Sequence, residues 1–276
     1  MTPPPRDRSR DVRVEDPTNR WVVHAAARAL LPLALRLRFS ANAVSIGGLA
    51  LGVLAALCYL RWDRFMFALL GFGLSIAWLI CDGLDGMIAR ATGTASALGR
   101  ILDGVCDHAV FILIYCAIAG SIGTGEGWAW AIAAGAAHAI QSSLYEAERI
   151  RFHRRLSGDP TPVRPRSVNP GVRAYDAVSA SLDPASAPFE RAFAASADRL
   201  AFAAAYGNAA APALRAMIPL SANTRVIAIL LACLSGNPRL FWGFELVPLT
   251  LVAIFGILWL RRVEARLSLG VTVPQH

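Results

Sequence analysis

The chain has 276 residues, of which 55% are hydrophobic and 17% are charged, and its mean hydropathy is +0.47. These values exceed those of soluble globular domains and indicate a membrane protein. The formal net charge is +8, but the arginines flank apolar runs instead of lining one polar face. We therefore expect attraction to anionic lipid headgroups and no nucleic-acid partner.

The first predicted element lies within residues 1–41, which we expect to form a cytoplasmic tail and an interfacial amphipathic helix. Residues 20–38 are apolar, but Arg20, His24 and Arg28 recur every four residues. This spacing gives a helix one basic face. The segment should therefore lie in the membrane interface and not cross the bilayer.

Six apolar segments follow, and each predicts a membrane-spanning helix. Segments 109–121 and 226–234 are shorter than the ~20 residues that a span needs, unless residues 98–108 and 222–225 extend their helices. We therefore expect an all-α integral membrane protein with six transmembrane helices. The six segments cover residues 43–60, 65–81, 109–121, 128–144, 226–234 and 240–260.

The distribution of arginine predicts the orientation of these helices. With the N-terminus inside, the short outer loops hold only Arg61, Arg64 and Arg239, and the other arginines fall on the cytoplasmic side. This bias is the one that the positive-inside rule describes. Both termini are therefore expected in the cytoplasm.

Residues 149–221 interrupt the series of spans. Residues 158–171 (GDPTPVRPRSVNPG) are rich in proline and turn formers and predict a loop. Residues 189–214 are rich in alanine and predict a helical hairpin. We expect a cytoplasmic insertion between residues 42–148, which hold spans one to four, and residues 222–276, which hold the last two spans and a cytoplasmic tail.

The most informative stretch joins the second and third predicted spans. Asp82 and Asp85 are three residues apart, and Asp103 and Asp107 are four apart, so each pair shares one face of a helix. A turn at residues 92–97 would bring the pairs together near the cytoplasmic surface. Clustered carboxylates at a membrane edge stay ionised only if cations lie between them. Hard oxygen ligands select Mg²⁺, Mn²⁺ or Ca²⁺, and four carboxylates are enough for two ions.

Glycines and one arginine accompany these aspartates. Gly83, Gly86, Gly99 and Gly104 would let helices approach closely and let a nucleotide lie against the backbone. Arg90 lies one helical turn beyond Gly86 and can bind a phosphate through two parallel hydrogen bonds. The stretch therefore predicts phosphate chemistry with divalent cations.

Residues 82–107 resemble the signature of the CDP-alcohol phosphotransferase (CDP-alcohol phosphatidyltransferase) family, D-x2-D-G-x2-A-R-x8-G-x3-D-x3-D. All eight fixed positions are present with the spacing intact. Residues 40–45 (SANAVS) resemble the family's shorter P-N-x-[VI]-[TS] element, with Ala41 in place of proline. The six-helix plan extends the likeness over most of the chain, but the insertion at 149–221 has no counterpart that we associate with the family.

The resemblance implies roles for particular residues. Asp82, Asp85 and Asp103 would hold two Mg²⁺ ions, or Mn²⁺ in their place, and Asp107 would be the general base and share a metal. The residues expected to bind the CDP-linked donor are Asn42, Ser45, Gly86, Ala89, Arg90 and Gly99.

The resemblance also implies the reaction. A phosphatidyl or other phospho-alcohol group would pass from a CDP-alcohol to an acceptor alcohol, with release of CMP, in phospholipid or related lipid biosynthesis. We expect CDP-diacylglycerol as the donor, and a soluble CDP-alcohol with a lipid acceptor is the alternative. The enzyme would be a homodimer in a bacterial inner membrane, with its active site facing the cytoplasm and membrane lipid around it.

The acceptor is not specified by this signature. His138, Gln141, Ser142, Tyr145 and Arg149 follow one face of the fourth predicted span, where they either satisfy one another's hydrogen bonds or face the acceptor. The basic run after this face is either a solvated or lipid-facing patch or a site for an anionic acceptor. It comprises Arg149, Arg151, His153, Arg154 and Arg155, and the candidates for acceptor binding are Tyr145, Arg149 and Arg151.

A divalent-cation transporter is a distant alternative, since carboxylates can line an ion pathway. A transporter would need acidic residues near the middle of the membrane on several helices. The four aspartates instead gather on two helices at one surface, which favours the transferase.

Overall fold

The structure is a computed structural model in which residues 11–160 and 183–270 are described. The side chains of residues 97, 98, 100–103, 183, 184 and 270 lie outside this description, although the backbone there is helical. All regular secondary structure in the described ranges is helical, which confirms the all-α prediction. The described residues form two compact units: unit I contains residues 16–138 and 221–248, and unit II contains the rest.

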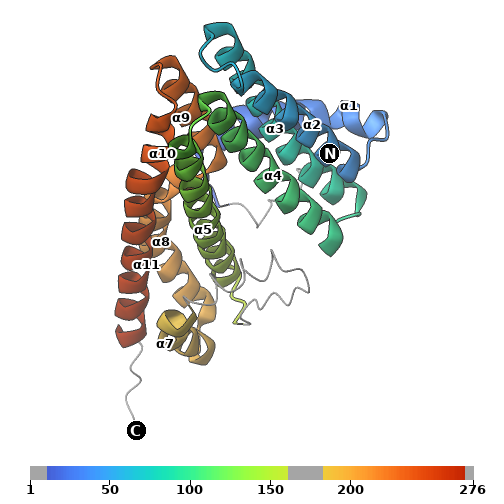
Figure 1. The fold of residues 1–276 in the computed structure, drawn as a ribbon. Coiled ribbons are helices and arrows are strands. Elements are labelled where there is room, and N and C mark those ends of the chain that lie inside the picture. The colour runs from blue at the N-terminus through green and yellow to red at the C-terminus, as the bar shows by residue number, and fades with distance from the viewer. Residues whose placement is uncertain (1–10, 161–182, 271–276) are drawn as a thin grey trace. The chain divides into compact units, whose positions relative to one another are not determined.

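Unit I contains the predicted catalytic segment. In Figure 1 its helices α2, α3 and α4 run side by side. A short π-helical turn and one further helix precede them, and the first part of α5 follows. The elements are η1 (Asn19–Val23), α1 (His24–Arg36), α2 (Ala41–Tyr59), α3 (Phe65–Thr92), α4 (Ala97–Ile122), α5 (Gly125–Leu156) up to His138, α9 (Ala222–Leu234), α10 (Arg239–Phe244) and η3 (Glu245–Leu249) up to Pro248.

The N-terminal helical segment, η1 with α1, packs against α3. Val23 and Ala27 are buried, and a Cβ atom added to Gly83 of α3 would lie 3.4 Å from Val23. Apolar side chains elsewhere on the segment, including Trp21 and Leu33, are exposed. The predicted N-terminal helix is therefore present and supports the part of α3 that carries the first two aspartates. Its position in a membrane interface stays a prediction.

Four helices are long and apolar enough to cross a membrane by length and composition. α9 is apolar but has 13 residues, or ~20 Å of helix, against a hydrocarbon core of ~30 Å. α5 covers the predicted span 128–144 but does not meet the same measures. The described ranges therefore support a multi-pass helical protein with four such helices, and not all six predicted spans. The four are Ala41–Tyr59, Phe65–Thr92, Gly104–Ile122 and Arg239–Leu269.

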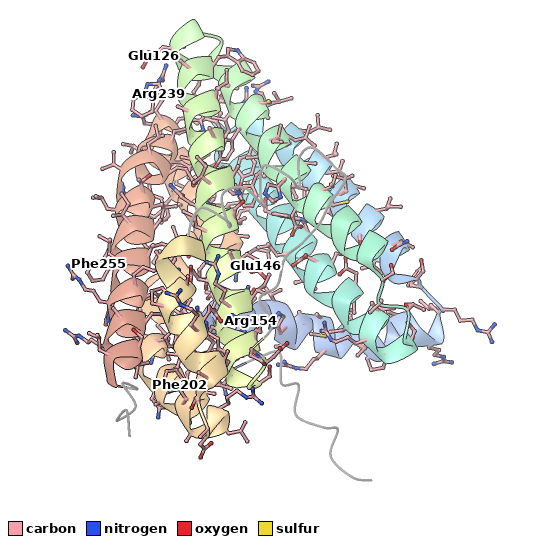
Figure 2. All side chains as sticks on the ribbon, turned by 90° about the horizontal axis from the view of Figure 1, so that it is seen from below. Glu126, Glu146, Arg154, Phe202, Arg239 and Phe255 are labelled. Carbon is pink, nitrogen blue, oxygen red and sulfur yellow. The ribbon has the colours of Figure 1, made fainter. Side chains whose placement is uncertain are left out.

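The first part of α5 packs within unit I. Glu126 at its start and Arg239 at the start of α10 approach to 3.8 Å (Figure 2). Further along, Ala131 and Ala134 belong to the same buried apolar cluster as Trp242 of α10. This part of α5 is therefore a core helix of the unit.

The connection between α3 and α4 has the predicted form. α3 ends at Gly93 in the left-handed conformation, with φ of 68°, which glycine adopts without steric cost. The hydroxyl of Ser96 then caps α4 by accepting a hydrogen bond from the backbone N–H of Gly99 at 3.0 Å. The turn at 92–97 is thus confirmed, and residues 98–108 extend the helix of the third predicted span.

A buried ion pair joins α9 to η3 in unit I. Arg225 donates hydrogen bonds from Nε and Nη2 to Oε1 of Glu245, both at 3.0 Å. The hydroxyl of Tyr115 on α4 donates to Oε2 of the same carboxylate at 3.0 Å and lies 3.3 Å from Nδ1 of His138. The bidentate partner balances the charge of Glu245 inside the bundle.

Unit II contains the predicted insertion. The hairpin predicted over 189–214 corresponds to α7 and α8, whereas the loop predicted at 158–171 falls almost entirely outside the described residues. The elements are α5 from Ala139 onward, α7 (Asp183–Ala195), α8 (Arg199–Ala216), η2 (Ile218–Leu220) and α11 (Thr250–Gly270).

A fully buried arginine holds these helices together. Arg155 of α5 donates to Oε1 of Glu190 on α7 at 2.7 Å and to Oε1 of Glu264 on α11 at 2.6 Å. It also donates to the hydroxyl of Tyr206 on α8 at 2.8 Å. Burial alone would raise the pKa of Glu190, but hydrogen bonds from Arg154 and the charge of Arg155 outweigh it, so the pKa lies below its usual value. The interpretation of the basic run as a solvated patch is therefore wrong for Arg154 and Arg155, which are buried in ion pairs.

Candidate active site

Close packing of α2 against its neighbours shapes the site. A Cβ atom added to Gly48 would lie 3.1 Å from Cβ of Cys81 on α3. One added to Gly52, a turn later, would overlap Val110 of α4. Glycines four residues apart allow helix backbones to approach in this way. Ser45, one turn before Gly48, is thereby brought against the aspartates of α3.

Three of the four predicted aspartates line one narrow hollow. Asp82 and Asp85 come from α3, and Asp107 comes from α4. Asp85 is buried, and its Oδ2 accepts a hydrogen bond of 2.5 Å from the hydroxyl of Ser45. The hollow is too narrow to enclose a small molecule, so a nucleotide would have to lie against it and not inside it. The complete lining is Ser45, Gly48, Trp78, Asp82, Asp85, Cys106 and Asp107.

The fourth aspartate, Asp103, lies on α4 one turn before Asp107, but its side chain is outside the described part of the structure. Among the described side chains, no three His, Cys, Asp or Glu residues form a group that could hold a metal ion. The donor set still fits a divalent cation in kind, because carboxylates from two helices supply the hard oxygens that Mg²⁺ and Mn²⁺ prefer.

The other predicted donor-binding residues lie outside the lining of the hollow. The exposed Arg90 folds back along α3, so that a Cβ atom on Gly86 would lie 3.4 Å from its Nη1. At the start of α4, a Cβ atom on Gly99 would lie 3.8 Å from Oδ1 of Asn42 on α2. Ala89 is partly buried on α3. The structure therefore brings Gly86 close to Arg90 and Asn42 close to Gly99.

The predicted acceptor residues belong to unit II. Tyr145 is buried, and the guanidinium of Arg149 lies 5.7 Å from the centre of its ring. Arg149 also pairs with Glu146 at 2.8 Å, and Arg151 pairs with the buried Glu148 at 2.7 Å. Tyr145 and Glu146 hold the side chain of Arg149, but this side chain stays 38% exposed. Its guanidinium can therefore still bind a further anion.

Two residues on the predicted polar face of the fourth span, His138 and Gln141, make internal hydrogen bonds. His138 is buried beside the hydroxyl of Tyr115, and Nε2 of Gln141 donates to the hydroxyl of Thr250 at 3.0 Å. For these two, the interpretation as internal hydrogen bonding fits the structure better than an acceptor-facing role.

Trp78 is a lining residue that the sequence interpretation missed. It lies four residues before Asp82 and seven before Asp85, which is the spacing of one helix face. That spacing could have revealed it. Cys106, the residue before Asp107 on α4, also lines the hollow.

Fold and site together define a multi-pass membrane protein with an acidic site of hard oxygen ligands. Residues 38–158 match the family model of the CDP-alcohol phosphatidyltransferases, which agrees with the resemblance of residues 82–107 to the signature of that family. The chain is therefore an enzyme that transfers substituted phosphate groups, and the family implies a place in phospholipid biosynthesis. No curated protein matches the chain in sequence. The matched segment contains every predicted site residue and ends before α7.

Proposed function

We propose that the enzyme transfers the phosphatidyl group of CDP-diacylglycerol to an acceptor alcohol and releases CMP. The observation that supports this most strongly is the hollow lined by Asp82, Asp85 and Asp107, within the segment that matches the family. The exposed apolar side chains of the spanning helices are compatible with a donor whose acyl chains stay in the bilayer.

The aspartates have two roles in this proposal. Asp82, Asp85 and Asp103 would hold Mg²⁺, which when bound supplies positive charge against the pyrophosphate of the donor and the charge that builds on CMP. Asp107 accepts the proton of the acceptor hydroxyl. The acceptor oxygen then forms a bond to the β-phosphorus of the donor as the bond from that phosphorus to the CMP oxygen breaks. Arg90, with the backbone at Gly86, would bind the phosphates.

A screen of CMP release tests the donor and the acceptor together. Purified enzyme would be offered CDP-diacylglycerol or a soluble CDP-alcohol, each with polar alcohols, alcohol phosphates or a lipid alcohol. We expect CMP only when the donor carries acyl chains. Release from a soluble CDP-alcohol with a lipid acceptor would favour the alternative donor.

The arrangement of charges supports transfer over cation transport. A transport pathway needs carboxylates that a cation can approach. Glu245, an acidic residue buried in unit I away from the predicted site, has both oxygens in hydrogen bonds from Arg225 and Tyr115. A carboxylate held in this way is already matched by a positive charge.

We further propose that α5 and α9 also cross the membrane, which would give six spans in a bacterial inner membrane. The packing of the first part of α5 in the core of unit I supports this for α5. Both termini, the 149–221 insertion and the active site would then face the cytoplasm, and the resemblance to the family supports a homodimer.

Cysteine labelling tests this topology. In a background without the five native cysteines, cysteines placed at Ser157 and Ser268 should react with an impermeant thiol reagent only from the cytoplasmic side. A cysteine at Gly125 should react only from the periplasmic side. Because Gly125 and Ser157 lie near opposite ends of α5, labelling of both from one side would show that α5 does not span.

Acceptor recognition leads to a prediction for Arg149. If the acceptor carries a phosphate, this partly exposed guanidinium should bind it, since its planar fork matches a phosphate and stays charged at any working pH. Arg149→Ala should then raise the acceptor KM about tenfold or more, or ~1.4 kcal/mol, with little change in the donor KM. Arg191→Ala, which removes an exposed arginine of α7, is the matched control. Equal losses for donor and acceptor would assign Arg149 to the fold or the nucleotide.

A further inference from the structure

The side chain of Ser45 points to a role different from the donor contact that the sequence suggested. Ser45 lies in the second turn of α2 and is 8% exposed. Its Oγ lies 2.5 Å from Oδ2 of Asp85 and 3.2 Å from the carbonyl oxygen of Ala41. Both neighbours accept hydrogen bonds, and the shorter distance is to the carboxylate. The hydroxyl proton therefore belongs to the bond with Asp85, which is a charge-assisted hydrogen bond.

Packing fixes this contact. Asp85 is 5% exposed and projects from α3 toward α2. Because Gly48 has no side chain, α2 lies so close to α3 that an added Cβ atom would come within 3.1 Å of Cys81 and 3.4 Å of Trp78. The close approach of the two helix backbones therefore places the hydroxyl of Ser45 against one oxygen of Asp85. Because both side chains are short, little conformational freedom remains to be lost when the hydrogen bond forms.

We propose that Ser45 is a positioning residue for the metal site, which orients the carboxylate of Asp85 through this hydrogen bond. This inference rests on the proposed function, in which Asp85 is a metal ligand. A carboxylate has about four lone-pair sites, so one hydrogen bond orients it without exhausting its capacity for a cation. Partners that orient metal ligands in this way typically account for 10–100-fold in metal affinity.

The position of Ser45 also explains which residues can replace it. A direct contact with a nucleotide could be made by longer polar side chains as well, but the narrow space between α2 and α3 requires a short donor.

The test measures cation affinity without substrate. Mn²⁺ would be titrated into the full-length enzyme in detergent, with free Mn²⁺ followed by electron paramagnetic resonance. We expect Ser45→Ala to raise the Kd for Mn²⁺ about tenfold or more, and Ser45→Thr to stay within about twofold of wild type. Ser75→Ala is the matched control: Ser75 is also buried on the neighbouring helix α3, but its hydroxyl bonds to the backbone of Gly71. This control should leave the Kd unchanged.

A second variant covers the case in which Ser45→Ala does not fold. Ser45→Cys keeps the shape of the side chain but offers only a weak S–H donor, so its Kd for Mn²⁺ should still rise several-fold. Wild-type Mn²⁺ affinity in folded Ser45→Ala or Ser45→Cys would overturn the proposal. So would an unchanged Kd for Mn²⁺ with a raised donor KM, which would return Ser45 to direct donor binding. Absence of Mn²⁺ binding by the wild-type enzyme would instead overturn the proposed function, and the role of Ser45 with it.

Discussion

Asp107→Asn should abolish detectable turnover while leaving the affinity for the CDP-linked donor within about tenfold of wild type. Asparagine has nearly the shape of aspartate, so the hollow that Asp107 lines with Asp82 and Asp85 should persist. It cannot accept the proton of an alcohol at neutral pH. Loss of a general base typically costs ~10²–10⁴-fold in rate, and the loss falls mainly on the transition state.

The measurement combines CMP release with a donor-binding titration. Asp63→Asn is a suitable control, because Asp63 lies exposed between α2 and α3 and forms only a surface pair with Arg61 at 3.7 Å. The control should retain full activity. Turnover by Asp107→Asn at the rate of the wild-type enzyme would remove Asp107 from the role of base.

Substitution of the predicted metal ligands should have the second large effect on the rate of CMP release. Asp82→Ala, Asp85→Ala and Asp103→Ala should each remove Mg²⁺-dependent CMP release. In a site for two ions, three carboxylates do not replace a missing fourth, because the remaining ligands are fixed on two helices. Excess EDTA should have the same effect on the wild-type enzyme.

A Mg²⁺ titration of CMP release and a Mn²⁺-binding titration measure the loss of the metal site. The temperature of unfolding shows whether each variant still folds. Each alanine variant should unfold at a temperature close to that of wild type and bind Mn²⁺ weakly or not at all. Asp63→Ala serves again as the control. A variant that keeps full activity at low Mg²⁺ would exclude its aspartate from the metal site.

The local parts of the site could be predicted from the sequence because they depend on helix spacing. Intervals of three and four residues, with a turn between two helices, predict that Asp82, Asp85 and Asp107 lie close together. The structure has that turn at Gly93 and lines one hollow with all three. The same periodicity would have supplied Trp78, which lies on the face of Asp82.

Contacts between distant segments could not be predicted in this way. Arg155 looked like a member of an exposed basic run, but its partners Glu190 and Glu264 are 35 and 109 residues away. Nothing in the local pattern links them. Arg225 and Glu245 are 20 residues apart, one just before the fifth predicted span and one within the sixth, and local pattern does not link them either. Local periodicity indicates which face of a helix is polar. It does not indicate which other helix packs against that face.

The number of spans shows a similar limit. Hydropathy marks α2, α3, most of α4 and the helix from Arg239 onward as able to cross a membrane. The apolar part of α5 was expected to span, yet its polar residues, such as the buried Gln141, are satisfied within the protein. A helix whose polar groups are paired internally can be less apolar than a lipid-facing helix. Composition alone therefore does not decide the topology of α5.

The most direct test of the central claim is release of CMP by the purified wild-type enzyme from CDP-diacylglycerol in the presence of an acceptor alcohol. We expect CMP release that requires the acceptor and Mg²⁺, stops in excess EDTA and returns when Mg²⁺ is restored. Asp107→Asn should release no CMP under the same conditions. CMP release at an undiminished rate in excess EDTA, or by Asp107→Asn, would contradict it.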